Sequence, residues 1–327
     1  MKIKKVLFYI VMSMLLAFLT GCGEKQTDNQ APEKVTLNDT EALSNGVMAI
    51  IRHENLMEKY LPENTKVEWT TLAAAAEIRD GIVSGNIDIG AYAFPSFIIG
   101  EENGLPLRMV SSVGGTPIKL YSNDETIQSL SDFSSEDKIA VVGLGSMLHI
   151  AFLAEANEQG LDVSQYDNVF SVMPHADGLA ALSGGNDVNG LLLTFPTTLK
   201  ADKTNTIHEV FDLSDICIQY GINVVSVMSE EMYEQHPEIA EAFLKAQEDA
   251  IKLYQEKPDY VAGFLAEKWE IDPQNIKDAW EKLPLIMEIK GYDKQAELLY
   301  EMGLIENSPK SFQELDNYDD LMKLQGK

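Results

Sequence analysis

The alternation of apolar and polar positions divides the chain after residue 34 into short strands and amphipathic helices. Apolar runs bounded by Gly, Pro and Asn predict strands, and apolar residues spaced three and four apart predict helices. The predicted strands are Val35–Leu37, Lys66–Leu72, 87–94, 107–114, 138–143, 168–173 and 188–195. The predicted helices are 47–61, 73–85, a short helix after Pro95, 144–160 and 177–185. This alternation is typical of an α/β fold with a largely parallel sheet.

The pattern has two halves and a helical end. A second series of strands and helices follows the segment that starts at Ile118, and from Glu230 onward helical patterns dominate. Pro237, Pro258, Pro273 and Pro309 separate these helices, as expected of residues that cannot continue a helix. We therefore expect two α/β units and a helix-rich C-terminal region.

A short pattern occurs twice, as "SGNIDIGAYAFPSF" (Ser84–Phe97) and as "SGGNDVNGLLLTFPTT" (Ser183–Thr198). Each copy passes from a Ser-Gly turn through an Asp and an apolar strand to Phe-Pro. Ligands of parallel α/β sheets bind at the carboxyl ends of the strands, which favours the two Phe-Pro segments as opposite walls of one cleft. The alternative is that Phe-Pro only ends a strand, because proline cannot donate to a sheet.

The N-terminus has the features of an export signal. Lys2, Lys4 and Lys5 precede an uncharged apolar run, Val6–Leu19, which is short for a membrane span. It ends in Leu-Thr-Gly-Cys22, which resembles the lipobox of bacterial lipoproteins and implies lipidation of Cys22 and removal of residues 1–21. An uncleaved anchor with a chance cysteine is the alternative. Residues 22–33 are polar and predict a flexible tether.

Composition narrows the classes of partner. About 306 residues remain without the signal (327 − 21), and the formal charge changes from −27 to −30 because three lysines are lost. A surface this acidic argues against nucleic acid and against charge-driven binding to an anionic bilayer. Cys217 is the one cysteine besides Cys22, so no internal disulfide is expected, and its apolar neighbours favour a packed thiol over a reactive one.

An ordered set of segments carries a resemblance to a known family. They are "VEWTTL", "GIVSGNIDIGAYAFP", "GLPLRMV", "IQSLSDF", "KIAVVGLGSMLH", "DGLAALSGGNDV" and "MGLIENSPKSF". This set resembles the solute-binding proteins of bacterial ABC importers for nitrate, sulfonates, taurine and thiamine-type pyrimidine precursors. The resemblance covers about residues 34–320. "DFSSEDK" (Asp132–Lys138) departs from the tighter turn of many relatives, and Arg52 and His53 stand where relatives often have small residues.

The resemblance implies a type II periplasmic-binding-protein fold, in which two α/β lobes enclose the ligand and two crossover segments join them. Lobe 1 would comprise 34–120 plus 226–327 and lobe 2 would comprise 121–225, with crossings near Thr116–Ser122 and Asn223–Ser229. It also implies an exported, lipid-anchored monomer that hands a small molecule to a permease and its ATPase. No cofactor, metal or catalytic residue is expected.

The segment "KIAVVGLGSMLHIAF" is the most informative for binding. A strand leads into Gly143-Leu144-Gly145, and Ser146 stands where a helix begins, so unpaired amides at that end are expected to attract an anionic group. Ser146 is equally suited to be an ordinary helix cap. His149 is placed to reach the ligand or to pack, and His175 to form a wall of the site or to remain a solvated loop residue.

Further candidates lie at strand ends. Tyr92 and Phe94 point to one face of their strand, which is either core or cleft. The remaining candidates stand where relatives touch their ligands: Thr40, Glu41, Thr71, Thr194, Phe195 and, beside a crossover, Thr116. With only three arginines in the chain and no evident cluster of them, we expect a flat or weakly anionic solute, such as a sulfonate or a heteroaromatic precursor.

Two other functions are alternatives to import: catalysis and sensing. A fungal pyrimidine synthase shares this fold, but the sequence has no counterpart of its cysteine-rich iron-binding motif, and the five histidines lack metal-ligand spacing. A sensory lipoprotein that presents the solute to a membrane receptor needs the same two-lobed body. Neighbouring genes for a permease and an ATPase distinguish import from sensing.

Overall fold

The computed structural model describes residues 31–40, 42–185 and 187–324. From Pro32 onward the described residues form one compact unit. The predicted signal, Cys22 and most of the predicted tether lie outside the described residues. Among the helices that are described, none has the length and apolar character needed to cross a bilayer.

Lobe 1 contains two small sheets. Strands β1 (Lys34–Asn38) and β2 (Lys66–Thr70) pair in parallel, and β3 (Gly90–Ala93), β10 (Val224–Ser229) and β4 (Leu107–Gly114) form a three-stranded sheet in the order β3-β10-β4. Leu37 bridges Ile89 in parallel, which connects the two sheets. The return of β10 between β3 and β4 therefore completes lobe 1 with a strand from late in the sequence.

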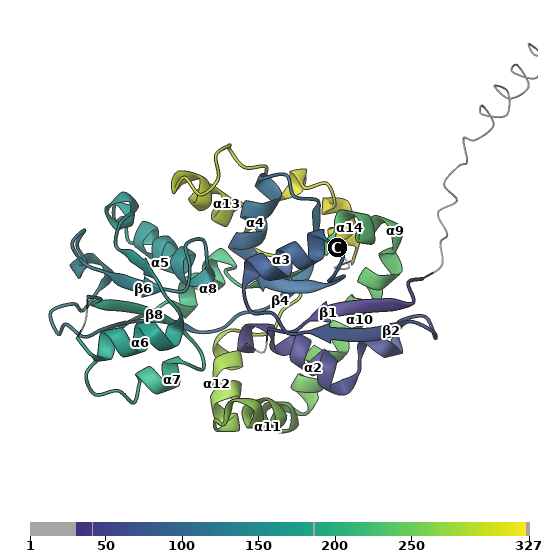
Figure 1. The fold of residues 1–327 in the computed structure, drawn as a ribbon, viewed down its shortest axis with the longest axis horizontal. Helices are drawn as coiled ribbons and strands as arrows, with labels where there is room; N and C mark the ends of the chain where they lie inside the picture. Colours follow the sequence, from purple (N-terminus) through teal and green to yellow (C-terminus); the bar gives the residue numbers. More distant parts are fainter. Residues whose placement is uncertain (1–30, 41, 186, 325–327) are drawn as a thin grey trace, which may run out of the picture. The chain divides into compact units, whose positions relative to one another are not determined.

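Lobe 2 is built on a five-stranded sheet in the order β7-β6-β8-β5-β9. The strands are β5 (Ile118–Ser122), β6 (Ile139–Val141), β7 (Phe170–Val172), β8 (Gly190–Thr194) and β9 (His208–Asp212). Figure 1 shows α5 (Met147–Glu158) and α8 (Ser214–Tyr220) on one side of this sheet, with α6 (His175–Ser183) and α7 (Thr198–Ala201) on the other. Lobe 2 thus has the layers of an α/β unit.

The helices of lobe 1 also cover both faces of its sheets (Figure 1). They are α2 (Gly46–Glu54), α3 (Ala75–Val83), α4 (Phe94–Glu102), α9 (Glu230–Gln235), α10 (Pro237–Glu256), α11 (Pro258–Trp269), α12 (Pro273–Lys282), α13 (Tyr292–Glu301) and α14 (Tyr318–Leu324). Short 3-10 turns lie at Leu43–Asn45, Met57–Lys59, Leu130–Asp132, Val163–Tyr166 and Phe312–Glu314. The α/β fold class is confirmed.

The strands run largely in parallel, as expected, with one antiparallel strand in each of the two larger sheets. β10 runs antiparallel to both β3 and β4, and β5 runs antiparallel to both β8 and β9. β5 and β10 are the strands that directly follow the two passages between the lobes. The chain therefore enters each of these two sheets through its antiparallel strand. The expected helix 47–61 is shorter, because Asn55 adopts a left-handed conformation (φ 51°) that ends α2.

Among the described residues, the buried apolar side chains form three clusters, the largest of which contains many residues of both lobes. They come mostly from the strands and from one stripe of each helix. Helix α10 buries Phe243 and seven other residues on its inner side. Its Gln247 is fully buried and hydrogen-bonds Ser111 through Oε1 and the carbonyl of Ser112 through Nε2, so this buried amide is fully engaged with β4. Cys217 is buried in α8, which confirms the expected packed thiol.

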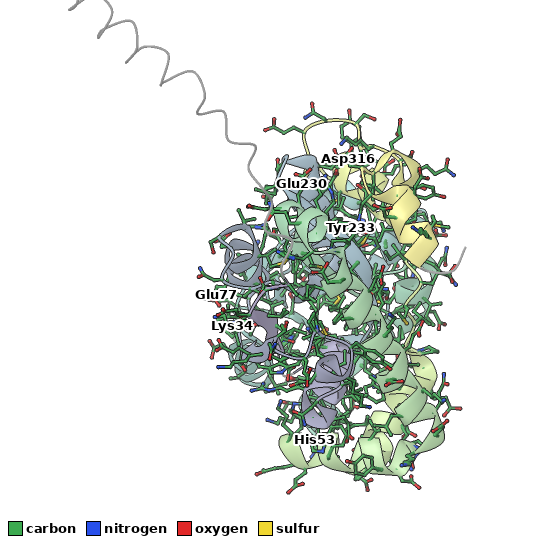
Figure 2. All side chains as sticks on the ribbon, turned by 90° about the vertical axis from the view of Figure 1, so that its right-hand side faces the viewer. Lys34, His53, Glu77, Glu230, Tyr233 and Asp316 are labelled. Atoms are coloured by element: carbon green, nitrogen blue, oxygen red, sulfur yellow. The ribbon has the colours of Figure 1, made fainter. Side chains whose placement is uncertain are left out.

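Arg108 fastens the C-terminal segment to lobe 1. Its guanidinium contacts Glu230 of α9 and lies 3.7 Å from Asp316 Oδ2, while Asn317 Nδ2 donates to the carbonyl of Met109 at 2.9 Å. Figure 2 shows Glu230 and Asp316 in the same region of the molecule. The segment around Asp316 and Asn317 therefore packs on the edge strand β4 of lobe 1.

Two passages join the lobes, and one segment of lobe 1 packs against both. The chain passes from Gly114 to Ile118 and from Tyr220 to Val224, so the crossings lie just before the positions expected from the resemblance. The segment 283–291 lies against them: a Cβ on Gly221 would stand 2.0 Å from the carbonyl oxygen of Lys290, and one on Gly291 would stand 1.9 Å from that of Tyr220. Both glycines have positive φ. This packing leaves no room for side chains there.

The repeated pattern folds alike in its first part only. Ser84 and Gly184 end their helices with the same backbone angles, and Gly85 and Gly185 follow with φ values of 72° and 66°. The Phe-Pro ends then differ. Phe94-Pro95 opens α4, whereas Phe195-Pro196 has a cis peptide bond and precedes α7. The two copies are therefore equivalent in their helix–turn–strand part and differ where the chain leaves the strand.

We expect Gly291→Ala to lower the free energy of unfolding by about 3 kcal/mol or more, because the methyl group meets backbone and the left-handed φ adds strain. Gly303→Ala is the matched control: its φ is 67°, but nothing lies within 4 Å of a Cβ there, so only about 1 kcal/mol is expected. Urea unfolding of both variants measures the difference. Equal losses would show that the close packing at Gly291 contributes nothing.

Candidate functional site

A cavity of about 610 Å³ lies between the two lobes. Lobe 1 contributes residues after β1, at the start of α3 and at the β3–α4 junction, and lobe 2 contributes the loop between β6 and α5. Val224, at the start of the returning strand β10, completes the wall. The lining is largely apolar, with alanines at four consecutive positions, 73–76. This is the size and character of a small-molecule site.

The β6–α5 loop presents a helix N-terminus to the cavity. Ser146, the N-cap of α5, accepts a hydrogen bond from the amide of His149 at 3.4 Å, so the predicted cap is present. Met147 and Leu148 follow it and line the cavity. The amides of these first two helical positions have no acceptor within the helix, and they carry its positive partial charge. Ser146 therefore both caps α5 and borders the cavity.

His149 has a structural role in this loop. Its Nδ1 accepts a hydrogen bond from the amide of Gly145 at 3.0 Å, and its ring packs edge-on against Phe170. Burial lowers the pKa of His149 to about 4, so the ring is neutral and its Nδ1 is free to accept. Gly145, with φ 73°, thus gives its amide to His149. Neither residue lines the cavity.

Lobe 1 faces the same space with two more helix N-termini. Ala74 is the N-cap of α3 and Ala93 is the N-cap of α4, and neither helix has a side-chain cap. An alanine has no side-chain oxygen that could accept from these amides, so the first-turn donors of α3 remain open where the cavity borders them. In α4 the amide of Phe94 donates to the carbonyl of Asn223 at 2.9 Å and Pro95 has no N–H, so its first two positions offer no open donor. At the start of α3 the lobe 1 wall therefore combines alanine side chains with main-chain donors.

Two buried side-chain oxygens of the lining have no partner among the described residues. They are the hydroxyl oxygens of Thr40 and Tyr92. Tyr92 is 3% exposed, and burial raises the pKa of its hydroxyl, which therefore stays protonated and can donate. Buried polar atoms without partners are rare in folded proteins and often mark a site that a ligand completes.

Arg79 is the one charged side chain among the described residues that line the cavity. Its Nε lies 3.7 Å from the carboxylate of Asp80, which is itself largely exposed. Asp80 is therefore a weak partner that solvent screens. In a chain with a formal charge of −27, the charge at this cavity is positive.

The structure brings together only part of the predicted set. Of the candidates, Thr40, Tyr92 and Ser146 line the cavity. Glu41 lies outside the described residues. The other candidates lie outside the lining: Thr71, Phe94, Thr116, Gly145, His149, His175, Thr194 and Phe195.

Three of these residues have packing or local roles. Phe94 is fully buried and packs near Phe97 and Tyr292. It begins α4 and does not continue β3, so the expectation that it shares a strand face with Tyr92 was wrong. Thr116 is buried beside the first crossover, with Oγ1 3.5 Å from the carbonyl oxygen of Phe195. Phe195 is buried in the apolar core of lobe 1 although it follows a strand of lobe 2.

His175 and Thr194 form a pair at the ends of two lobe 2 elements. His175 begins α6, and its Nε2 lies 3.2 Å from Oγ1 of Thr194 at the end of β8. Burial lowers the pKa of His175, and its Nδ1 has no partner among the described residues. Thr71 is exposed, with Oγ1 3.4 Å from Nη1 of Arg52.

Arg52 and His53 border a separate cavity of about 290 Å³ within lobe 1. Nη1 of Arg52 lies 3.7 Å from the buried carboxylate of Asp39, and the ring of His53 stacks on Phe264 with centroids 4.0 Å apart. Figure 2 shows His53 far from Glu230 and Tyr233, at the other end of the lobe. These two residues thus pack against α11.

Sequence reasoning missed Arg79 and the alanines at 73–76. A signal was present, because an alanine-rich segment directly after a strand supplies a helix start without a capping side chain. Arg79 stands four residues after position 75, one helical turn into α3. That spacing places it on the same side of the helix as the open first turn.

Comparison with known proteins assigns the family. A family model described as NMT1/THI5 like matches residues 62–261, which is more than half of the chain. The chain belongs to the NMT1/THI5-like family. A comparison with curated protein sequences found no match.

Solved structures show the fold of this NMT1/THI5-like chain. The periplasmic aliphatic sulphonate-binding protein SsuA from Escherichia coli matches with a TM-score of 0.69 and 18% identity, covering 91% of this chain and 100% of that one. The alkanesulfonate-binding SsuA from Xanthomonas axonopodis pv. citri, bound to MOPS, matches at 0.70 and 16%, covering 86% and 96%. The Candida albicans CA3427 product, with the generic periplasmic binding protein fold, matches at 0.68 and 13%, covering 90% and 94%. The predicted fold is confirmed.

We expect the stability of the protein to fall as the pH drops from 6.5 to 4, in part through His149. Its folded pKa of about 4 lies below the ordinary value of 6.5, so the unfolded chain takes up this proton first and folding loses up to about 3 kcal/mol across that window. His149→Asn keeps an acceptor near Nδ1 but does not titrate. Urea unfolding against pH should give a flatter slope for the variant, and identical slopes would contradict this account.

Proposed function

We propose that this chain is an extracytoplasmic solute-binding lipoprotein that captures a small organic anion between its lobes and delivers it to an ABC importer. The main observation in support is the inter-lobe cavity, where the open N-termini of α3 in lobe 1 and α5 in lobe 2 border a largely apolar space. Arg79 is the one charged side chain among the described residues of its lining. Family membership and the periplasmic-binding-protein fold support a solute-binding role independently of the cavity.

The cavity favours a ligand with one negative group and a compact apolar body. The amides of Met147 and Leu148 suit an anionic head without any lysine or arginine from lobe 2. Arg79 supplies one full positive charge, which balances a monoanion better than a multiply charged phosphate. The alanine wall and Ile99 suit an alkyl chain or a flat ring. Sulfonates and anionic pyrimidine-type solutes have this chemistry.

Capture follows from contacts on both sides of the cavity. A ligand that touches α5 of lobe 2 and α3 of lobe 1 gains more contacts when the lobes approach, so its binding favours the closed arrangement. The lining contains no His, Cys, Asp or Glu among its described residues. A site without a general base or an activated nucleophile is suited to holding a solute and not to changing it.

The N-terminal sequence supports the site of action. A lipidated Cys22 would hold the body at the outer face of the cell membrane through two or three acyl chains, whereas a single chain binds only marginally. The polar residues before β1 would then serve as the tether. In this position the protein needs no charge attraction to the bilayer, which agrees with its acidic composition.

A thermal-shift panel tests the ligand class. We expect alkanesulfonates, taurine, MOPS or an anionic pyrimidine to stabilise the protein, by about 2.7 kcal/mol for a ligand present at a hundred times its Kd. Inorganic phosphate and uncharged alcohols should have no effect. Stabilisation by phosphate with none by the monoanions would overturn the proposed ligand class.

Arg79→Gln tests the charge in the cavity. With the monoanion that gives the largest shift in the panel, we expect at least a tenfold increase in Kd, because a charge-assisted hydrogen bond is worth about 1.5–3 kcal/mol. Lys66→Gln removes the same charge from an exposed strand position outside the cavity and serves as the control. Isothermal titration calorimetry measures both. An unchanged Kd in Arg79→Gln would place the anion elsewhere.

A further inference from the structure

A second groove between the lobes, of about 470 Å³, has walls of opposite charge. Its lobe 2 wall includes Lys200 and Lys203 at α7, and its lobe 1 wall includes Glu270 and Asp272 in the turn between α11 and α12. We propose that these four side chains form an electrostatic latch: they are apart in this structure and pair across the groove when the lobes close. The groove is separate from the 610 Å³ cavity and shares no residue with it.

The lysines of the latch are not neutralised within their own lobe. Asp202 stands between them in sequence, but it accepts from Tyr121 Oη at 2.7 Å and from Lys119 Nζ at 3.3 Å. Lys119 also pairs with Glu209 at 2.7 Å. Across the described residues, no ion pair involves Lys200 or Lys203. Both are exposed, so their charges face the groove and the solvent.

The carboxylates of the latch are equally available. Glu270 ends α11 in a left-handed conformation, with φ 54°, at a position where glycine costs least. Asp272 caps α12 by accepting from the amide of Gln274 at 2.8 Å through Oδ1, which leaves Oδ2 for another donor. In the part of the chain that the structure describes, neither carboxylate is within ion-pair distance of a cation.

The other end of α12 is already attached to lobe 2. Lys282, its last residue, pairs with Asp212 of β9. Burial works against ionisation of Asp212, but hydrogen bonds from Lys282 and Ser214 outweigh it and hold the pKa of this carboxyl below its usual range. Helix α12 has 10 residues and is about 15 Å long. One of its ends thus touches lobe 2 through a formed ion pair, and the other faces lobe 2 across the groove.

This arrangement has a direct consequence for closure. Helix α12 is packed into lobe 1 through its buried residues Ile276, Ala279 and Trp280, so it moves with that lobe. A rotation of lobe 1 about the Lys282–Asp212 contact would narrow the groove and bring the latch charges together, with no ligand between them. Exposed ion pairs are individually weak and are screened by salt. Two pairs change the closed population by up to about tenfold at low ionic strength, and a ligand that needs the closed state gains the same factor in affinity.

Zero-length cross-linking with a carbodiimide tests the latch without a ligand. The reagent joins a lysine amine to a carboxylate only when the two are in contact. Because the amide formed is irreversible, cross-linked product builds up even when only a minor fraction of the molecules is closed at any moment. In the full chain at low salt, we expect peptides containing Lys200 or Lys203 joined to peptides containing Glu270 or Asp272. The Lys282–Asp212 link is the internal control, since that pair is already formed.

Two comparisons decide the outcome. The first uses the double variant Glu270→Gln/Asp272→Asn, in which the introduced asparagine keeps an oxygen that can cap α12. This variant should reduce the yield of the groove cross-link at least tenfold and leave the Lys282–Asp212 link unchanged. Raising the salt from about 0.01 M to 1 M shortens the Debye length from about 30 Å to 3 Å and should reduce the yield several-fold. The proposal would be overturned if the control link formed at low salt without the groove link. It would also be overturned if the yield of the groove link stayed the same in the double variant and at high salt.

Discussion

The direction of the chain at the ends of β2, β3 and β6 determines what the main cavity can hold. In a strand–turn–helix unit, the carboxyl end of the strand and the amino end of the next helix lie at the same edge. Lobes that face each other through such edges turn several helix N-termini toward one space. Here α3 and α4 do so from lobe 1 and α5 from lobe 2. The positive character of the cavity therefore follows from topology, and Arg79 adds to it.

The lack of side-chain caps gives that topology its effect. Serine, threonine or aspartate at the N-cap of α3 would satisfy an amide of the first turn and reduce what a ligand could gain. Alanine at 74 leaves these donors open, and the alanines at 73–76 also let a ligand approach the main chain closely. In α4 the amide of Phe94 already donates to the carbonyl of Asn223, and Pro95 has no N–H. At α5 the cap Ser146 bonds only the third amide, so Met147 and Leu148 keep theirs. In this cavity, small apolar side chains thus admit a ligand close to the backbone, and the backbone amides supply its hydrogen-bond donors.

The helices and strands could be predicted from the sequence more accurately than the surroundings of the individual side chains. The strand and helix patterns, the two-lobed class, the cap at Ser146 and the packed Cys217 were all readable, because each depends on local spacing or on neighbours in the chain. His149 and Phe94 were harder: whether they face the cavity depends on how Phe170 and Tyr292, distant in sequence, pack against them. Arg79 was overlooked although its spacing from the alanines at 73–76 places it on the side of the open first turn; that this side faces lobe 2 depends on the folded arrangement of both lobes.

Cys217 has a consequence for how the protein is made. It is the one cysteine in the described residues, it is buried in α8, and burial raises the pKa of its thiol. Thiol–disulfide exchange requires an exposed thiolate, so this sulfur is inert once α8 is packed. The described part of the chain can therefore fold without a disulfide oxidant or a disulfide isomerase, and its one thiol is insensitive to whether the surroundings are oxidising or reducing.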